Sequence, residues 1–210
     1  MTQITLVRHG ETEWNLQEIF RGRTDIELNE TGIKQAELLA QYLSRVEIEA
    51  IYSSPLKRAL RTAEVMASYH NLDIDIAPGL IDFDYGRWHG LPHQEVKDGY
   101  EELYTEWIRN PHRVKMPGGE RLSDVRRRAM SVVDNIISQH EGTVALISHR
   151  VVNKVLICAL LGLDNSHFWN IKQDIGGITT FTYENKRFIL TRHNDTSFLS
   201  PIQKAQLSDF

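Results

Sequence analysis

The feature that most constrains the fold is a short apolar run that stops abruptly at charged residues. Near the start of the chain, Ile4 to Val7 are followed directly by Arg8, His9 and Gly10. An apolar run of this length is typical of a buried strand, and a glycine after it marks a sharp exit from the sheet. The sequence therefore predicts a strand that presents Arg8 and His9 at its carboxyl end, where open α/β sheets bind ligands.

The same pattern recurs in the second half of the chain, where the apolar run Val144 to Ile147 leads to His149 and then to a helix-forming stretch. Between the two, a short strand is predicted at residues 50–53, followed by a Ser-Pro pair that can begin a helix containing Arg58. The carboxyl ends of parallel strands lie at one edge of a sheet. We therefore expect two histidines and two arginines to meet there, near helix N-termini.

The remaining periodicity predicts helices that alternate with short strands. Apolar residues at helical spacing predict helices over residues 31–44, 55–70, 100–110, 122–140 and 150–161. Further strands are predicted at residues 75–77, 177–183 and 188–191, with an irregular tail from residue 195. This alternation favours an α/β fold with a mostly parallel sheet covered on both faces. Because no linker or repeat interrupts the pattern, we expect one domain over residues 1–210.

The composition is that of an ordinary globular domain and argues against several functions. The 210 residues are 41% hydrophobic and 25% charged, with a net charge of -4 and a pI of about 6.1. This balance gives no general case for binding nucleic acid or an anionic membrane. No apolar stretch approaches the roughly 20 residues of a membrane span, and the N-terminal run is too short for a signal peptide. We expect a cytoplasmic protein, and we leave a homodimer open.

Cysteine and histidine usage gives no metal site. Cys158 is the single cysteine, so an internal disulfide and a cysteine cluster are both excluded. Its neighbours are apolar, which predicts an inert core thiol. Among nine histidines there is no His-Glu-x-x-His pattern, and the Gly-Leu-Pro segment between His89 and His93 does not place them on one helix. We therefore expect no metal and no other cofactor.

The expected cluster of histidines and arginines suits an anion, and phosphate fits best. Arginine forks match phosphate oxygens, and helix N-termini add positive potential. A neutral imidazole can also attack phosphorus and form a covalent intermediate. Phosphoryl transfer then needs a proton for the leaving group. The aperiodic segment 78–90, too long for a plain connection, supplies Asp82 or Asp84 for that task.

These residues carry a resemblance to a known family, the histidine phosphatase superfamily, also called the phosphoglycerate mutase-like family. The first motif, Leu6 to Asn15, resembles the family signature, and four further segments match in order. The further segments are residues 29–36, residues 52–63, residues 86–90, and residues 117–120 with Ser148-His149.

The resemblance implies a three-layer α/β/α sandwich with a mixed, mainly parallel sheet and no metal. It implies that His9 is the nucleophile that becomes phosphorylated. Arg8, Arg58 and His149 would then hold the phosphoryl group, and Asn15 would help to orient it. Asp82 stands where the family usually has a glutamate, so it is the predicted acid, with Asp84 as the competing candidate.

Three further positions differ from the commonest family pattern. Arg21 stands before Gly22 where many members have glutamine, His89 replaces a glutamate, and Arg150 follows His149 where many have glycine. We place Arg21, Gly22 and Arg150 with Asn15 among the substrate-binding residues, although surface salt bridges are an equal alternative for the two arginines. These changes make the pocket more cationic, which predicts a substrate that is anionic beyond its phosphate.

The sequence thus predicts a metal-independent phosphomonoesterase that acts on a small phosphorylated metabolite. One alternative is a phosphoglycerate mutase, which the short span from Leu91 to Pro117 disfavours. Another is a non-catalytic protein that binds a phosphorylated ligand. Phosphoglycerate, phosphoserine and α-ribazole phosphate all remain open as substrates.

Several other conspicuous residues receive structural interpretations. Trp88 is predicted to anchor its loop by packing, and His89 to be structural or to lie at the rim of the site. The run Arg126 to Arg128 is predicted to be the solvated face of its helix.

Overall fold

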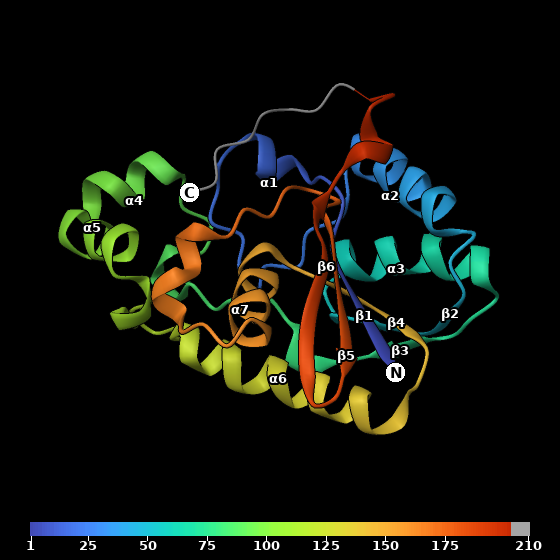
Figure 1. Ribbon diagram of the computed structural model, residues 1–210. Helices are drawn as coiled ribbons and strands as arrows, with labels where there is room; N and C mark the ends of the chain where they lie inside the picture. Colours follow the sequence, from blue (N-terminus) through green and yellow to red (C-terminus); the bar gives the residue numbers. More distant parts are fainter. Residues whose placement is uncertain (203–210) are drawn as a thin grey trace.

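A six-stranded sheet divides the molecule into layers in the computed structural model, which describes residues 1–202 (Figure 1). The strand order is β3-β2-β4-β1-β5-β6. Strands β3, β2, β4 and β1 pair in parallel, whereas β5 pairs antiparallel with both of its neighbours, β1 and β6. The strands are β1 Thr2–Arg8, β2 Ile48–Ser53, β3 Ile74–Ile76, β4 Thr143–Ser148, β5 Ile178–Glu184 and β6 Arg187–Asp195.

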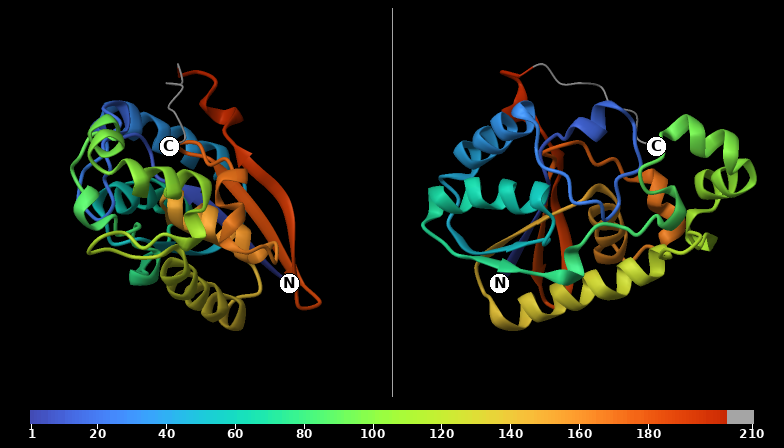
Figure 2. Two further views of the ribbon diagram at one scale, coloured as in Figure 1. Left: turned by 90° about the vertical axis from the view of Figure 1, so that its left-hand side faces the viewer. Right: turned by 180° about the vertical axis from the view of Figure 1, so that it is seen from behind.

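Helices cover both faces of this sheet (Figure 2). The α-helices are α1 Glu13–Leu16, α2 Glu30–Leu43, α3 Lys57–His70, α4 His93–Gly99, α5 Glu101–Arg109, α6 Leu122–Gln139 and α7 Arg150–Leu160. The described residues also form short 3-10 helices: η1 Pro78–Leu80, η2 Gly86–Trp88, η3 Pro111–Arg113, η4 Asn165–Asn170 and η5 Ser197–Leu199. The mixed sheet with helices on both sides confirms the predicted α/β/α sandwich. Within the described residues, no helix combines the length and apolar character needed to cross a membrane.

Two separate apolar cores explain why the central strands read as continuous apolar runs. In β1, Ile4 and Leu6 pack into one core with α6 and α7, whereas Val7 packs into the other with α2 and α3. In β4, Val144 and Ala145 divide in the same way. Because successive side chains point to opposite faces, a strand that is buried on both faces shows no polar alternation.

The strand register brings the predicted junctions to one edge of the sheet. Arg8 at the end of β1 pairs with Ser148 at the end of β4, and Ser53 at the end of β2 pairs with Ile147. The residues that follow these three strands therefore leave the sheet at the same level. The edge predicted from the sequence is present, with His9, Arg58 and His149 all at it.

The structure differs from the sequence prediction at several element boundaries. Helix α3 begins at Lys57 and not at Pro55, because Leu56 keeps an extended backbone with a φ of -75° and a ψ of 136°. The Ser54 hydroxyl bonds His149 at 2.7 Å and accepts the Leu56 N–H at 3.4 Å. Helix α4 was not predicted, since its seven residues bury only Val96 and give no apolar period. The predicted irregular tail begins as the end of β6 and η5, and residues 203–210 lie outside the described part.

Two glycines let helix α2 approach the loop after β1. The Asn29 side chain caps α2 by accepting the Gly32 N–H at 2.8 Å. A Cβ on Gly32 would lie 2.1 Å from the Glu11 carbonyl oxygen, and one on Gly10 would lie 2.5 Å from the Gly32 oxygen. The start of α2 therefore rests against the backbone that follows His9.

We expect Gly32→Ala to destabilise the protein by about 1–3 kcal/mol, because the new methyl group meets backbone that has no room to move. Gly99→Ala in α4 is the matched control, since a Cβ there meets nothing within 4 Å. The control should be neutral or stabilising by up to about 1 kcal/mol, from helix propensity. Urea unfolding measures both variants, and equal free energies of unfolding would contradict this packing.

Candidate active site

His9 is held in one orientation by backbone contacts at the end of β1. Its side chain is buried, with 1% of the residue exposed. Its Nδ1 lies 2.6 Å from the Gly10 carbonyl oxygen. A carbonyl oxygen only accepts, so Nδ1 carries a proton. In the neutral ring Nε2 is then unprotonated, and the free lone pair lies on the side of the ring away from Gly10.

The surroundings of His9 favour its neutral form. Burial is the main reason that the pKa of His9 is lowered well below its usual value. The positive charges of Arg58 and Arg8, together with His149, lower that pKa further. A neutral imidazole is the form that can attack phosphorus.

Arg58 is the most buried cation of the site. Its side chain is fully buried at the start of α3, and Nη2 lies 2.9 Å from Asp82 Oδ2. The same guanidinium donates to the carbonyl oxygens of Gly22 at 2.7 Å and Thr24 at 2.8 Å. Arg58 therefore joins the loop after α1 to the acid loop, the segment 78–90 that carries Asp82. Arg8 is also buried, and its Nη1 donates to the Gln173 carbonyl oxygen at 2.6 Å.

His149 lies against His9 from the end of β4. The two ring centroids are 5.2 Å apart. The Nε2 of His149 bonds the Ser54 hydroxyl at 2.7 Å, and its Nδ1 lies 3.6 Å from Asp82 Oδ2. The facing carboxylate favours the tautomer with the proton on Nδ1, so Ser54 donates to Nε2. Burial and then Arg58 lower the pKa of His149 well below its usual value.

The structure separates the two candidate acids. Asp82 lies at the pocket beside Arg58 and His149, with its Oδ1 accepting the Phe83 N–H at 2.8 Å. Asp84 instead accepts the Gly86 N–H at 2.9 Å and lies 3.6 Å from Arg23. Its contacts are those of a residue that shapes the loop. Of the two, Asp82 is the one that lines the pocket, and its role as the acid stays a prediction.

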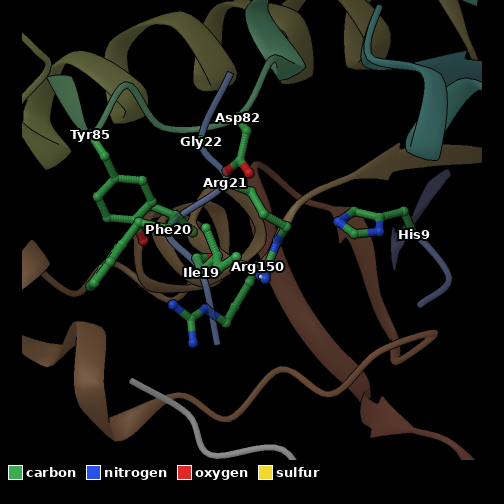
Figure 3. Close-up of a pocket in the computed structure, with 9 residues that line it drawn as sticks. His9, Ile19, Phe20, Arg21, Gly22, Asp82, Tyr85 and Arg150 are labelled. Carbon is green, nitrogen blue, oxygen red and sulfur yellow. Dashed lines mark hydrogen bonds between the residues drawn. The ribbon is translucent and has the colours of Figure 1, made fainter. Parts of the chain in front are cut away.

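A small pocket opens beside these groups. His9, Arg21 and Asp82 face this space (Figure 3). Arg21 donates to the Trp14 carbonyl oxygen at 3.0 Å. Burial, and then the charges of Arg8 and Arg150, lower the pKa of Arg21 to about 9. Arg21 thus adds a cation to the pocket wall that His9 and Asp82 share.

Arg150 and Tyr85 form another part of the pocket wall. Arg150 is the first residue of α7 and is 8% exposed. It hydrogen-bonds the hydroxyl of Tyr85, a buried residue whose pKa is raised mainly by burial. Both arginines that were predicted either to touch substrate or to form surface salt bridges thus line the pocket.

The other predicted binding residues differ in their placement. Gly22 lines the pocket with a φ of +46°, and a Cβ there would lie 2.1 Å from His89 Nε2. His89 accepts the Tyr85 N–H at 3.0 Å, a structural contact in keeping with its prediction. Asn15 accepts both the N–H and the hydroxyl of Thr12, at 2.9 and 2.8 Å, and is not among the residues lining the pocket. Its role in orienting phosphate stays a prediction.

The predicted solvated face of Arg126 to Arg128 is wrong for two of the three residues. Arg126 donates to the Leu163 carbonyl oxygen at 2.6 Å, and Arg128 donates to carbonyl oxygens of the acid loop. Only Arg127 is exposed, with 77% of its side chain accessible. A run of three charges fixes no side-chain direction, so the sequence could not distinguish them.

Sequence reasoning also missed Tyr85, Ser54 and the apolar pocket walls from Ile19, Phe20 and Val151. No local pattern marks Tyr85 or the apolar residues, and the Ser-Pro pattern marked Ser54 only as a helix start. Two other structural interpretations are confirmed: Trp88 is fully buried in the core, and burial raises the pKa of the Cys158 thiol to about 11. In residues 1–202, no group of three or more His, Cys, Asp or Glu side chains is arranged to hold a metal ion.

Comparison with known proteins decides the family. A family model described as histidine phosphatase superfamily (branch 1) matches residues 4–196. The chain belongs to the histidine phosphatase superfamily. It is therefore an enzyme, a phosphatase of the histidine phosphatase type. The resemblance stated from the sequence motifs is confirmed.

Similar proteins agree with this assignment. Phosphoserine phosphatase 1 of Hydrogenobacter thermophilus is 38% identical over 200 residues, which cover 95% of each chain. The solved structure of Bacillus stearothermophilus YhfR has a TM-score of 0.90 and 32% identity, and covers 95% of this chain and 100% of that one. A mutant phosphoserine phosphatase of Entamoeba histolytica in complex with phosphoserine has a TM-score of 0.83 and 30% identity, with the same coverage.

The contact with Gly10 predicts one tautomer of His9. Nitrogen-15 NMR of histidine-labelled protein should show His9 with a protonated Nδ1 and a bare Nε2, assigned by comparison with His9→Gln. Because its pKa is lowered, His9 should stay neutral as the pH falls through about 6.5, the usual histidine value. A titration midpoint for His9 at or above that value would contradict the assignment.

Proposed function

We propose that this phosphatase hydrolyses a small phosphomonoester through a covalent phosphohistidine on His9. The observation that carries the proposal is a fixed His9, whose neutral form is favoured, at a pocket wall that also holds Arg21 and Arg150, with Arg8 and Arg58 buried beside it. Such a wall suits the charge on the equatorial oxygens of a transferred phosphoryl group, a task that Mg²⁺ often shares in other enzymes.

In the first step, Nε2 of His9 attacks phosphorus as the bond to the leaving oxygen breaks. The leaving oxygen takes a proton from Asp82 and departs as an alcohol. In the free protein Asp82 is paired with Arg58. A bound phosphoryl group competes for that guanidinium, and its negative charge favours a proton on the neighbouring carboxyl group.

In the second step, the Asp82 carboxylate takes a proton from water as the water oxygen attacks phosphorus. The bond from phosphorus to Nε2 breaks, which releases inorganic phosphate and restores the lone pair of His9. Asp82 regains the proton that it gave in the first step, so the cycle closes without any further reactant.

The favoured substrate class is a phosphomonoester that also carries a carboxylate. Arg21 and Arg150 line the pocket next to the cations that would hold the phosphoryl group, so a second anionic group has partners there. The relative of 38% identity is named a phosphoserine phosphatase, and a related structure from Entamoeba histolytica contains 3-phosphoglyceric acid. Phosphoserine and phosphoglycerate are therefore the first compounds to test.

Two alternative functions make different products. A mutase would return the phosphoryl group to another hydroxyl of phosphoglycerate, and a binding protein would release nothing.

We expect stoichiometric release of inorganic phosphate, undiminished by EDTA. His9→Ala should lower kcat by at least about three orders of magnitude, because it removes the nucleophile. Isomerisation of phosphoglycerate faster than phosphate release would favour the mutase instead.

The preference for a second anionic group is tested with Arg150→Gln. A charge-assisted hydrogen bond contributes about 1.5–3 kcal/mol, so KM for phosphoserine should rise about 10- to 100-fold. KM for 4-nitrophenyl phosphate, which carries no anionic group besides its phosphate, should change by less than about threefold on the same reasoning. Arg87→Gln, at an exposed arginine in the segment that carries Asp82, is the control. If the wild-type enzyme prefers esters whose phosphate is their single anionic group, that result contradicts this substrate class.

A further inference from the structure

The guanidinium of Arg128 is fully used in holding the loop that carries Asp82. Its Nη1 donates to the carbonyl oxygens of Gly79 and Ile81, at 2.7 and 2.5 Å. Its Nη2 donates to the Asp82 carbonyl oxygen at 3.1 Å and to Glu120 Oε2 at 3.1 Å, and Nε donates to Glu120 Oε1 at 3.0 Å. Arginine has five N–H donors, so each donor has one acceptor here.

Glu120 extends this arrangement to the next part of the loop. Its carboxylate accepts the Asp84 N–H at 3.1 Å, and its own N–H donates to the Asp84 carbonyl oxygen at 2.9 Å. Arg23 adds an ion pair to Glu120 at 2.9 Å and a longer bond to the Asp82 carbonyl oxygen at 3.4 Å. The backbone on both sides of the Asp82 side chain is therefore fixed to α6 and to the turn before it.

The loop lies directly on α6 at its first glycine. A Cβ on Gly79 would lie 2.7 Å from the Arg128 carbonyl oxygen and 2.6 Å from a methyl group of Val132. This close approach brings the carbonyl oxygens of the loop within reach of the Arg128 side chain. The helix and the loop thus form one rigid unit, although Arg128 is not among the residues that line the pocket.

The position of that backbone matters because aspartate has a short side chain. Only one methylene separates the Asp82 carboxyl group from its Cα, so the side chain has little freedom to correct a displaced backbone. The Asp82 carboxylate must also stay 2.9 Å from Arg58 and 3.6 Å from His149 Nδ1. A misplacement of about 1 Å can cost about 100-fold in rate.

We propose that Arg128, locked by Glu120, is a positioning residue that sets the reach of Asp82 toward the leaving oxygen. This proposal rests on the proposed function, in which Asp82 protonates that oxygen. Arg128 contacts the backbone of residues 79–82 and does not line the pocket, although its charge also helps to lower the pKa of His149. Its loss should therefore impair proton donation more than substrate binding.

The test compares Arg128→Gln with wild type on two esters, phosphoserine and 4-nitrophenyl phosphate. The alkoxide of serine needs a proton in order to leave, whereas nitrophenolate leaves without one. We expect kcat/KM for phosphoserine, which reports steps up to the phosphohistidine, to fall about 10- to 100-fold. For 4-nitrophenyl phosphate it should fall by less than about threefold, since the nucleophile and the arginines of the pocket are unchanged.

Two further variants sharpen the test. Arg128→Lys keeps the charge with three donors, so it should restore part of the loss on phosphoserine. Arg127→Gln is the matched control, because the neighbouring Arg127 side chain is 77% exposed and pairs only with Asp124 in the described contacts. It should leave both esters within about twofold of wild type, as surface ion pairs contribute little.

The possible outcomes are distinct. Equal losses on both esters, or no loss, would overturn the positioning role while leaving the proposed function intact. Wild-type protein that releases phosphate from neither ester would contradict both. If Arg128→Gln does not fold, as judged by circular dichroism, Glu120→Gln replaces it with the same readout and a smaller selective loss expected. Equal losses for that variant would likewise overturn the role.

Discussion

The buried ion pair between Arg58 and Asp82 is the interaction on which the site depends. A guanidinium removed from water is stable only when partners replace the water, and Arg58 finds them in this carboxylate and in the carbonyl oxygens of Gly22 and Thr24. One side chain therefore fixes the acid loop and the loop that lines the pocket. In the proposed mechanism, a phosphoryl group that enters competes with Asp82 for Arg58, which would couple substrate binding to freeing the acid.

Much of the fold and half of the site follow from local sequence patterns. Apolar runs without alternation indicate strands buried on both faces, and the residues that follow them, His9 and His149, must then lie at one edge of the sheet. This inference needs only the strand direction, so it placed the histidines and Arg58 together correctly. The resemblance to the family, carried by a long motif, added which histidine is the nucleophile, and that role is still a proposal.

What the sequence could not predict depends on contacts between distant segments. Arg128 and Arg127 are adjacent and chemically identical, yet one holds the acid loop and the other is exposed, because the helix turns by about 100° per residue. The sequence marked Ser54 as a helix start, but in the folded chain its hydroxyl bonds the distant His149. Tyr85 has no local signal at all, since its contact with Arg150 joins the acid loop to α7.

The central claim is that the phosphoryl group passes through Nε2 of His9. The most direct test is mass spectrometry of peptides from enzyme mixed with phosphoserine and quenched in alkali within milliseconds, where phosphohistidine survives. The account predicts a phosphate on the peptide that contains His9, present during turnover, lost on brief acid treatment and absent from His9→Ala. Turnover without this phosphate, or with the phosphate on another residue, would contradict it.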